Sequence, residues 1–255
     1  MGVAVPFVHG PEGVDVYDGS TTYNAPGISA TRGGWVGSNL RYVMPCDGTW
    51  KRHLVKVYPA PAASKSYGFY LSKGGSSYLT VSLFNPSTSG SNLSGELDVA
   101  AGDVFYYGMT GSAGSGNSIQ QHSLLIEPSV AGTIPFLLAA AGGPTIDYWG
   151  LGGHFASGAS YEARVHCVVP IPGKFKSLYL YSCDGTVASD VVICLRKNGA
   201  NTALTATIPN GSAAASNLAS EVSFGAGDMG TLSVNCTTYE YVAIGFCFVP
   251  DDPKQ

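Results

Sequence analysis

The chain has 255 residues, of which 45% are hydrophobic and only 12% are charged, and its formal net charge is -4 at pH 7. Ordinary soluble domains carry about 25% charged residues, so this surface must consist largely of Ser, Thr, Asn, Gly and Tyr, a composition that favours burial in an assembly. The absence of a Lys/Arg cluster argues against nucleic-acid binding, and no apolar run reaches the ~20 residues of a membrane helix.

The chain opens with a Gly/Pro-rich segment, Met1 to Gly13, which contains VAVPFV around Phe7. A second segment of this kind, Ser129 to Pro144, contains TIPFLL around Phe136. Each is either the first strand of its own unit or an arm that adds a strand to a neighbouring subunit or fills a groove on it. Phe7 and Phe136 are therefore candidate assembly contacts. The N-terminus has no basic region before a long apolar core, so we expect no secretory signal.

Strand signals dominate the rest of the chain. Trp50 to Tyr58 and Phe175 to Tyr181 are rich in strand-forming residues that alternate between polar and apolar, which is typical of half-buried strands. Tyr67 to Gly75 and Val191 to Gly199 each end in Lys-Gly-Gly or Lys-Asn-Gly. Because these pairs tolerate the positive φ angles of a tight turn, we expect a hairpin at both places.

One segment occurs twice. SNLSGELDVAAGD at positions 91–103 and SNLASEVSFGAGD at 216–228 are identical at seven of thirteen positions, at an offset of 125 residues. Both predict a strand of alternating residues, followed by an Ala-Gly-Asp turn in which Gly adopts unusual backbone angles. Weaker matches extend through both halves of the chain, so we infer a unit of about 127 residues that is present twice.

This pattern predicts an all-β protein with two tandem antiparallel β-sandwiches of the jelly-roll type, produced by an internal duplication. The first sandwich would span residues 1–129, with the Gly/Pro-rich segment as an N-terminal arm. The second would span 130–255 and begin with a Gly-rich linker. Each half has a normal single-domain length and can enclose its own core.

Two carboxylates recur with the repeat, Glu96/Glu221 and Asp103/Asp228. As an acid and base pair they would suit glycoside hydrolysis. Since each pair lies on opposite sides of a turn in a motif that strand and turn formation already explain, we expect structural roles and no enzyme. Neither a nucleophile elbow nor a phosphate-binding loop is present.

No metal or cofactor is expected from the sequence. The histidines at positions 9, 53, 122, 154 and 166 lack metal-ligand spacing, and no C-x-x-C pair occurs. The six cysteines divide one to five between the halves, whereas a disulfide framework should repeat along with the fold. We therefore expect free thiols, in keeping with synthesis in a reducing cytoplasm.

Trp149 lies in the Gly-rich segment TIDYWGLGGHF and is the aromatic residue that we expect to be exposed. Its ring would serve either as an assembly contact or as a stacking surface for sugars. Trp149 thus joins Phe7 and Phe136 as a candidate contact residue.

Taken together, the repeat resembles the tandem jelly-roll (TNF/C1q-like) structural proteins of tailed bacteriophages. The resemblance rests on three recurring pieces, which are PCDGTW and PIPGKF, LSKGG and LRKNG, and AAGD and GAGD. It implies a virion protein that decorates or cements capsids, forms fibres or sits in baseplates, often as a homotrimer. It implies no catalytic residue. The chain has no coiled-coil or collagen-like shaft, which favours capsid decoration over a fibre tip.

We therefore expect a bacteriophage capsid decoration or cement protein that forms a homotrimer and binds the major capsid protein or other virion proteins. It would be made in the host cytoplasm and reside in the virion. The alternative is a carbohydrate- or receptor-binding module of a tail fibre or host-recognition protein, with a host glycan as its ligand.

Overall fold

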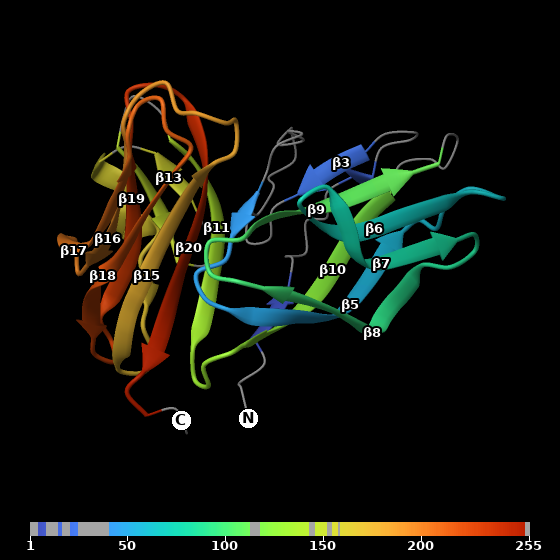
Figure 1. Cartoon of the computed structure of the whole chain (residues 1–255), viewed down its shortest axis with the longest axis horizontal. Helices are drawn as coiled ribbons and strands as arrows, with labels where there is room; N and C mark the ends of the chain where they lie inside the picture. The colour runs from blue at the N-terminus through green and yellow to red at the C-terminus, as the bar shows by residue number, and fades with distance from the viewer. Residues whose placement is uncertain are drawn as a thin grey trace.

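The computed structural model describes residues 5–8, 15–16, 21–24, 41–112, 118–142, 146–151, 155–157 and 159–252. Within these ranges the chain forms twenty strands and one 3-10 helix, arranged as two groups of strands side by side (Figure 1). The strands of the N-terminal half are β1 (Val5–Val8), β2 (Asp15–Val16), β3 (Thr21–Asn24), β4 (Tyr42–Val43), β5 (Gly48–Tyr58), β6 (Ser66–Lys73), β7 (Ser76–Phe84), β8 (Ser89–Val99), β9 (Val104–Gly111) and β10 (Ser118–Pro128).

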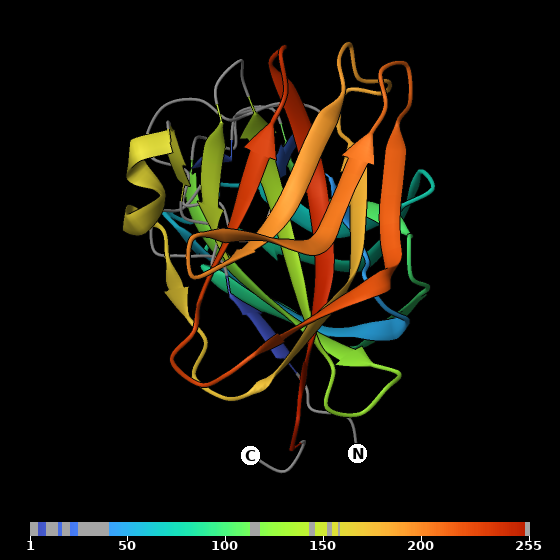
Figure 2. The ribbon, with the colours of Figure 1, turned by 90° about the vertical axis from the view of Figure 1, so that its left-hand side faces the viewer.

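The elements of the C-terminal half are β11 (Ile134–Gly142), β12 (Asp147–Gly150), β13 (Phe155–Ser157), η1 (Ala159–Arg164), β14 (Cys167–Val168), β15 (Gly173–Ser182), β16 (Val191–Lys197), β17 (Ala200–Ile208), β18 (Ala214–Phe224), β19 (Met229–Asn235) and β20 (Glu240–Pro250). Figure 2 looks onto this half, with the helix η1 at its edge, where it contacts β12 and β13.

Each half contributes two sheets. In the N-terminal half the strand orders are β1-β10-β5-β8, with β2 beside β10, and β3-β9-β6-β7, with β4 beside β9. In the C-terminal half they are β11-β20-β15-β18 and β13-β12-β19-β16-β17, with β14 beside β19. No sheet formed by the described residues mixes strands of the two halves. We call β1–β10 the first sandwich and β11–β20 the second sandwich.

The fold class predicted from the sequence is confirmed, because all strand pairs are antiparallel and the strands form sandwiches. The two strand orders correspond except that β2 in the first half and β13 in the second have no counterpart. Even an irregularity corresponds, since β5 skips Arg52 in its pairing with β8 and β15 skips Ser177 in its pairing with β18. Both skipped residues have a positive φ, 52° and 58°, and produce a β-bulge.

The two Phe-containing segments are the first strands of their own sandwiches. β1 pairs with β10, where Phe7 lies opposite Leu124. β11 pairs with β20, where Phe136 lies opposite Phe246. Of the two alternatives for these segments, an arm or a first strand, the structure supports the first strand for β1 and β11.

The repeated motif at 91–103 and 216–228 closes one edge of each sandwich. The side-chain amide of Asn92 donates to Thr80 O at 3.2 Å, and that of Asn217 donates to Thr205 O at 2.8 Å. These bonds join the edge strand of one sheet, β8 or β18, to the edge strand of the facing sheet, β7 or β17. The repeat is therefore explained by a structural role, since unpaired sheet edges otherwise invite aggregation.

The two cores differ in composition although the frames match. The first is rich in large aromatic side chains and includes Trp50, with His53 buried beside it. The His53 ring bonds to Leu79 O through Nδ1 at 2.6 Å and to the Tyr107 hydroxyl through Nε2 at 3.0 Å. The second core holds phenylalanine and aliphatic side chains, such as Phe175, whose ring packs edge-on against Phe224 at 4.9 Å.

The first sandwich docks with one end on the outer face of β15 and β20. Val43 of β4, which is 2% exposed, packs against Ala243 and Cys183 of the second sandwich. The Arg41 guanidinium donates to the Tyr181 hydroxyl at 3.1 Å. A Cβ on Gly245 would lie 2.2 Å from Val43 O, so only glycine permits this close approach. Figure 1 shows β20 and β11 on the side of the second sandwich that faces the first.

Candidate functional site

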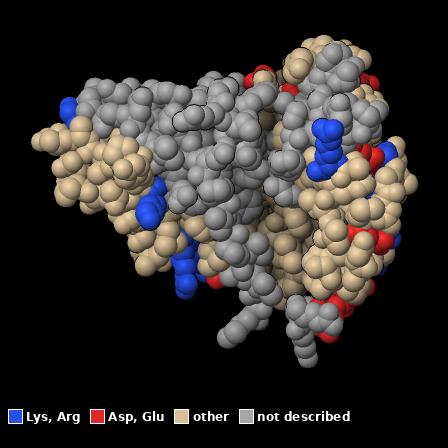
Figure 3. Space-filling view, turned by 180° about the vertical axis from the view of Figure 1, so that it is seen from behind, with Lys and Arg blue, Asp and Glu red and all other residues tan. Residues whose placement is uncertain are grey.

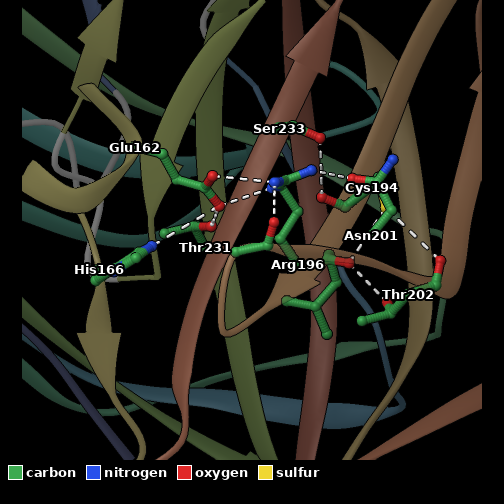
Figure 4. A network of polar contacts seen from close by, with 10 residues as sticks. Glu162, His166, Cys194, Arg196, Asn201, Thr202, Thr231 and Ser233 are labelled. Atoms are coloured by element: carbon green, nitrogen blue, oxygen red, sulfur yellow. Dashed lines mark hydrogen bonds and ion pairs between the residues drawn. The ribbon is translucent and has the colours of Figure 1, made fainter. Parts of the chain in front are cut away.

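The outer side of the second sandwich carries a polar cluster centred on Glu162 and Arg196 (Figure 4). Arg196 lies on β16 and points away from the core, because the neighbouring residue Leu195 faces inward. Its Nε donates to Glu162 Oε1 at 2.6 Å and its Nη2 donates to Glu162 Oε2 at 3.0 Å. Thr231 of β19 donates its hydroxyl to the same carboxylate at 3.0 Å. The cluster thus ties η1 to the sheet.

Charge and hydrogen bonds keep Glu162 ionised. Burial by itself raises the pKa of Glu162, but the hydrogen bonds from Arg196 and Thr231 outweigh it, so the pKa lies below its ordinary value. His166 adds an ion pair across 3.8 Å when it is protonated. A carboxylate held in this way accepts hydrogen bonds and is a poor proton donor. A structural role for Glu162 follows.

The other Arg196 donors are also occupied. Nη1 donates to the side chain of Asn201 and Nη2 to Gly199 O, while the guanidinium lies over the Tyr148 ring at 5.6 Å from its centroid. These contacts fix the turn between β16 and β17. Four hydrogen bonds from the guanidinium are thus made within the second sandwich, which is a structural role.

A shallow hollow of about 150 Å³ adjoins the cluster. Its lining residues come from β12 and the residue before it, and from β16, β17 and β19; they are Ile146, Tyr148, Val192, Cys194, Arg196, Asn201, Thr205, Ser233 and Asn235. The Cys194 thiol points toward Leu195 O and Thr202 O, and Cys194 is 4% exposed. The lining therefore combines apolar side chains with amide and hydroxyl groups.

At the equivalent place in the first sandwich, the ring of Tyr70 lies over the sheet. Where Cys194 lies opposite Ser233, the first sandwich places Tyr70 opposite Gly108. A Cβ on Gly108 would lie 2.4 Å from the Tyr70 ring, so this ring covers the strand directly. Two differences between the halves, tyrosine in place of cysteine and glycine in place of serine, thus let a ring occupy this space.

The recurring carboxylates do not converge on a cleft. Glu96 pairs with Lys51 at 3.0 Å and Glu221 with Lys174 at 2.5 Å, in both cases across neighbouring strands. Asp228 pairs with Lys197 at 2.8 Å and accepts the Gly225 backbone N–H at 2.6 Å.

Asp103 makes the matching contacts, to Lys73 and to the Ala100 backbone N–H. The hydrogen bonds from Lys197 and Asn198 lower the pKa of Asp228 to about 2. In both halves the aspartate fixes the turn and the glutamate bridges two strands, which are structural roles.

All six cysteines are free thiols, and four of them are buried. Burial raises the pKa of Cys183 and that of Cys236 to about 11, so both remain protonated at neutral pH. Cys46 and Cys247 are hydrogen-bonded to each other across the contact between the two sandwiches. That hydrogen bond and burial raise the pKa of the Cys247 thiol.

The structure places the three candidate contact residues in different surroundings. Trp149 is 6% exposed and belongs to the core of the second sandwich, so the expectation that it is exposed is wrong. On β12 the strand alternation turns Trp149 inward toward that core. Phe136 is half-buried and stacks on Phe246 at 5.1 Å, within its own sandwich. The backbone of Phe7 lies in β1, and its side chain lies outside the described residues.

No motif in the sequence predicts the Glu162–Arg196 cluster. Only a comparison of the halves hints at it, because Arg196 stands where the first half has Ser72. In the described part of the chain, no group of three His, Cys, Asp or Glu side chains could hold a metal ion. The same residues contain no helix that is long and apolar enough to cross a membrane.

No family model matches the chain, and the curated proteins gave no match. Solved structures with some similarity include the major capsid protein P2 of bacteriophage PM2, at 7% identity and TM-score 0.30 over 97% of both chains. Another is PNGF-II, at 8% identity and TM-score 0.29 over 98% of this chain and 65% of that one.

A triple jelly-roll protein from the turret of an archaeal virus matches at 12% identity and TM-score 0.28, over 98% of this chain and 60% of that one. These TM-scores are all low, and the three proteins differ in kind. None of the three similarities indicates a function for this chain.

Proposed function

We propose that this protein is a structural component of a virion, most specifically a bacteriophage capsid decoration or cement protein that acts by adhesion. The observation that carries the proposal is a low-charge surface with large apolar side chains exposed on both sandwiches. The most exposed are Leu54, Tyr58, Phe84, Leu93, Val130, Val168, Leu218 and Tyr239, at 46 to 76%.

Single exposed apolar residues are ordinary, but their combination with few charges favours a protein whose surface is covered by partners. Among the described residues on the face seen in Figure 3, Lys, Arg, Asp and Glu form scattered spots between uncharged residues. Charged residues are depleted at the centres of protein interfaces, which agrees with this surface.

The internal architecture supports adhesion rather than chemistry. The charged groups of the repeated motif and of the Glu162–Arg196 cluster are engaged in turns, strand bridges and the η1 anchor, and Arg41 bonds to Tyr181 across the contact between the sandwiches. Two sandwiches in one chain also provide two separate surfaces, so that a single copy can bridge neighbouring capsid subunits. Buried area spread over many such copies would stiffen a shell against the pressure of packaged DNA.

The proposal is tested on purified particles. We expect the protein to be present in stoichiometric amounts in the virion, and to bind again when added to particles from which it has been removed. Restored particles should withstand heating to a higher temperature than depleted ones. Absence of the protein from purified particles would overturn the proposal.

The alternative, a carbohydrate- or receptor-binding module, rested mainly on an exposed Trp149. Since Trp149 is buried, this alternative depends on exposed tyrosines such as Tyr58 and Tyr239. A glycan-array signal that is lost in Tyr58→Ala or Tyr239→Ala would favour the module over the capsid protein.

A further inference from the structure

The two sandwiches end in equivalent surfaces. We define the β4 end as residues 42–45 with the turn 100–104, and the β14 end as residues 167–170 with the turn 225–229. In the β4 end, Met44 N donates to Asp103 O at 2.9 Å. In the β14 end, Val169 N donates to Asp228 O at 2.8 Å. All these positions are offset by 125, so the backbone of the two ends is built in the same way.

The strand pairing in the two ends agrees as well. Val43 lies opposite Val104, and Val168 lies opposite Met229, again at an offset of 125. Their surroundings differ. Val43 is 2% exposed because the β4 end is covered by the second sandwich, whereas Val168 is 65% and Met229 36% exposed. The β14 end thus presents exposed apolar side chains that no described residue covers.

The face that receives the β4 end also has an equivalent. We define the β15–β20 face as the outward side of these strands, where Tyr179 lies opposite Gly245. The β5–β10 face is its counterpart in the first sandwich, where Leu54 lies opposite Ser123. Leu54 is 46% exposed, and Tyr58 on the same face is 76% exposed. Leu54 and Tyr58 are therefore large side chains exposed on this second face, where Lys56 is also exposed.

We propose that the β14 end of one chain docks on the β5–β10 face of a second copy of the chain, in the arrangement that the β4 end and the β15–β20 face adopt within each chain. This inference rests on the proposed function, because it supplies the contact by which a homotrimeric virion component assembles. The in-chain contact is the template for the contact between chains.

The docking is head to tail, since the two surfaces that meet are different. Such an interface closes into a ring when the rotation between neighbouring copies permits it. Three chains would then form a ring of six sandwiches, in which contacts within and between chains alternate. In such a ring every β14 end and every β5–β10 face would be covered.

The two surfaces carry exposed charges of opposite sign. Asp251 and Asp252 are exposed beside the β14 end, where Asp251 N donates to Pro172 O at 3.1 Å, and Lys56 is exposed on the β5–β10 face. Ser123 carries a side chain where Gly245 has none. The second copy must therefore sit farther from the sheet than Val43 does, which makes the contact between chains weaker than the contact within one.

The first experiment measures the mass of the intact protein by light scattering. We expect a trimer of about 79 kDa, three times the chain mass of 26.3 kDa. Val168→Asp should shift this mass to that of a monomer, because a buried charge opposes docking. The matched control is Leu218→Asp, since Leu218 is 58% exposed on β18, away from both surfaces, and should leave the trimer intact.

The second experiment copies the Cys46–Cys247 pair onto the contact between chains. The equivalent positions are Ile171, offset by 125 from Cys46, and Leu125, which faces Lys51 as Cys247 faces Lys176. The double variant Ile171→Cys/Leu125→Cys is treated with glutathione disulfide. The two new thiols should form an interchain disulfide, and glutathione disulfide takes up their two electrons and two protons to give two molecules of glutathione. Non-reducing gels should then show covalent oligomers, which neither single variant should form.

The outcomes separate this inference from the proposed function. A trimer that survives Val168→Asp and gives no specific cross-link would overturn the docking surface, as would a wild-type monomer at every concentration. In both cases the particle experiment would still decide whether the protein belongs to the virion. The docking surface would be supported if the trimer is lost in Val168→Asp but not in Leu218→Asp, and if only the double cysteine variant forms interchain cross-links.

Discussion

The two sandwiches share one frame but enclose different cores. His53 and Leu178 occupy equivalent places, opposite Asn92 and Asn217 in the edge strands β8 and β18. His53 bonds to Leu79 and Tyr107 inside an aromatic core, whereas Leu178 is packed among phenylalanine and aliphatic side chains. The comparison teaches that bulges, turns and edge bonds specify the frame, while the core residues can change from polar to apolar.

The largest expected difference between the halves is the loss of stability at acid pH. Burial lowers the pKa of His53 to about 4, from an ordinary value of 6.5. Between pH 6.5 and 4 the unfolded chain therefore binds the proton and the folded chain does not, so stability falls as the pH falls. The free energy of unfolding of the first sandwich should therefore be about 3 kcal/mol lower at pH 4 than at pH 7. Hydrogen exchange at pH 7 and pH 4 should show the loss in β5–β9 and not in β15–β19.

His53→Leu places the residue of the second sandwich in the first. It should remove most of this pH dependence, although it leaves the Tyr107 hydroxyl to find another partner. If the wild type and the variant lose the same amount of stability at acid pH, the assignment of this effect to His53 is contradicted.

The contact between the sandwiches offers the next test. Gly245→Ala puts a Cβ 2.2 Å from Val43 O, so the sandwiches must move apart, at a cost of about 1 to 3 kcal/mol. The equivalent residue of the first sandwich is Ser123, and Ser123→Ala should change stability by less than about 0.5 kcal/mol. Urea denaturation of the full chain measures both. Equal midpoints would show that the contact tolerates a larger separation.

The Glu162–Arg196 cluster distinguishes the outer sides of the halves. Glu162→Gln leaves the mostly buried Arg196 guanidinium without its charged partner and should cost about 2 kcal/mol at pH 7. Because the pKa of Glu162 is lowered in the folded chain, this contribution is lost as the pH falls through that pKa.

The control is Glu221→Gln, whose ion pair with Lys174 is about half exposed, so this substitution should lower the stability much less than Glu162→Gln does. Thermal unfolding at pH 7 gives both values. A larger loss in the control would mean that η1 is held mainly by other contacts.

The smallest effects should be equal in the two halves. Asn92→Ala and Asn217→Ala each remove the bonds that join two edge strands and should cost about 1 kcal/mol. Hydrogen exchange should locate each loss in its own sandwich. Clearly unequal losses would contradict a shared role for the repeated motif.

Much of the frame could be predicted from local pattern. The alternation of polar and apolar residues predicts that Trp50 lies on the inward side of a strand, as it does in β5. The Lys-Asn-Gly run predicts the hairpin that joins β16 to β17. The repeated Ala-Gly-Asp turn was expected, and Asp103 and Asp228 cap it in the expected way. These features depend on neighbours along the chain, so the sequence specifies them.

The candidate site could be predicted far less well. Trp149 was expected to be exposed because its segment is rich in glycine, but pairing of β12 with β19 turns it into the core. The Glu162–Arg196 cluster joins residues 34 positions apart, and no local pattern marks such a pair.

By itself, the sequence determined that this protein is all-β, that its two halves share one strand pattern, and where the turns between strands lie. Only the tertiary structure decided that Val43 is buried and its equivalent Val168 exposed. The physical reason is that alternation and turn chemistry act between neighbouring residues. The exposure of an outward-facing side chain depends instead on what packs against it from far away in the sequence.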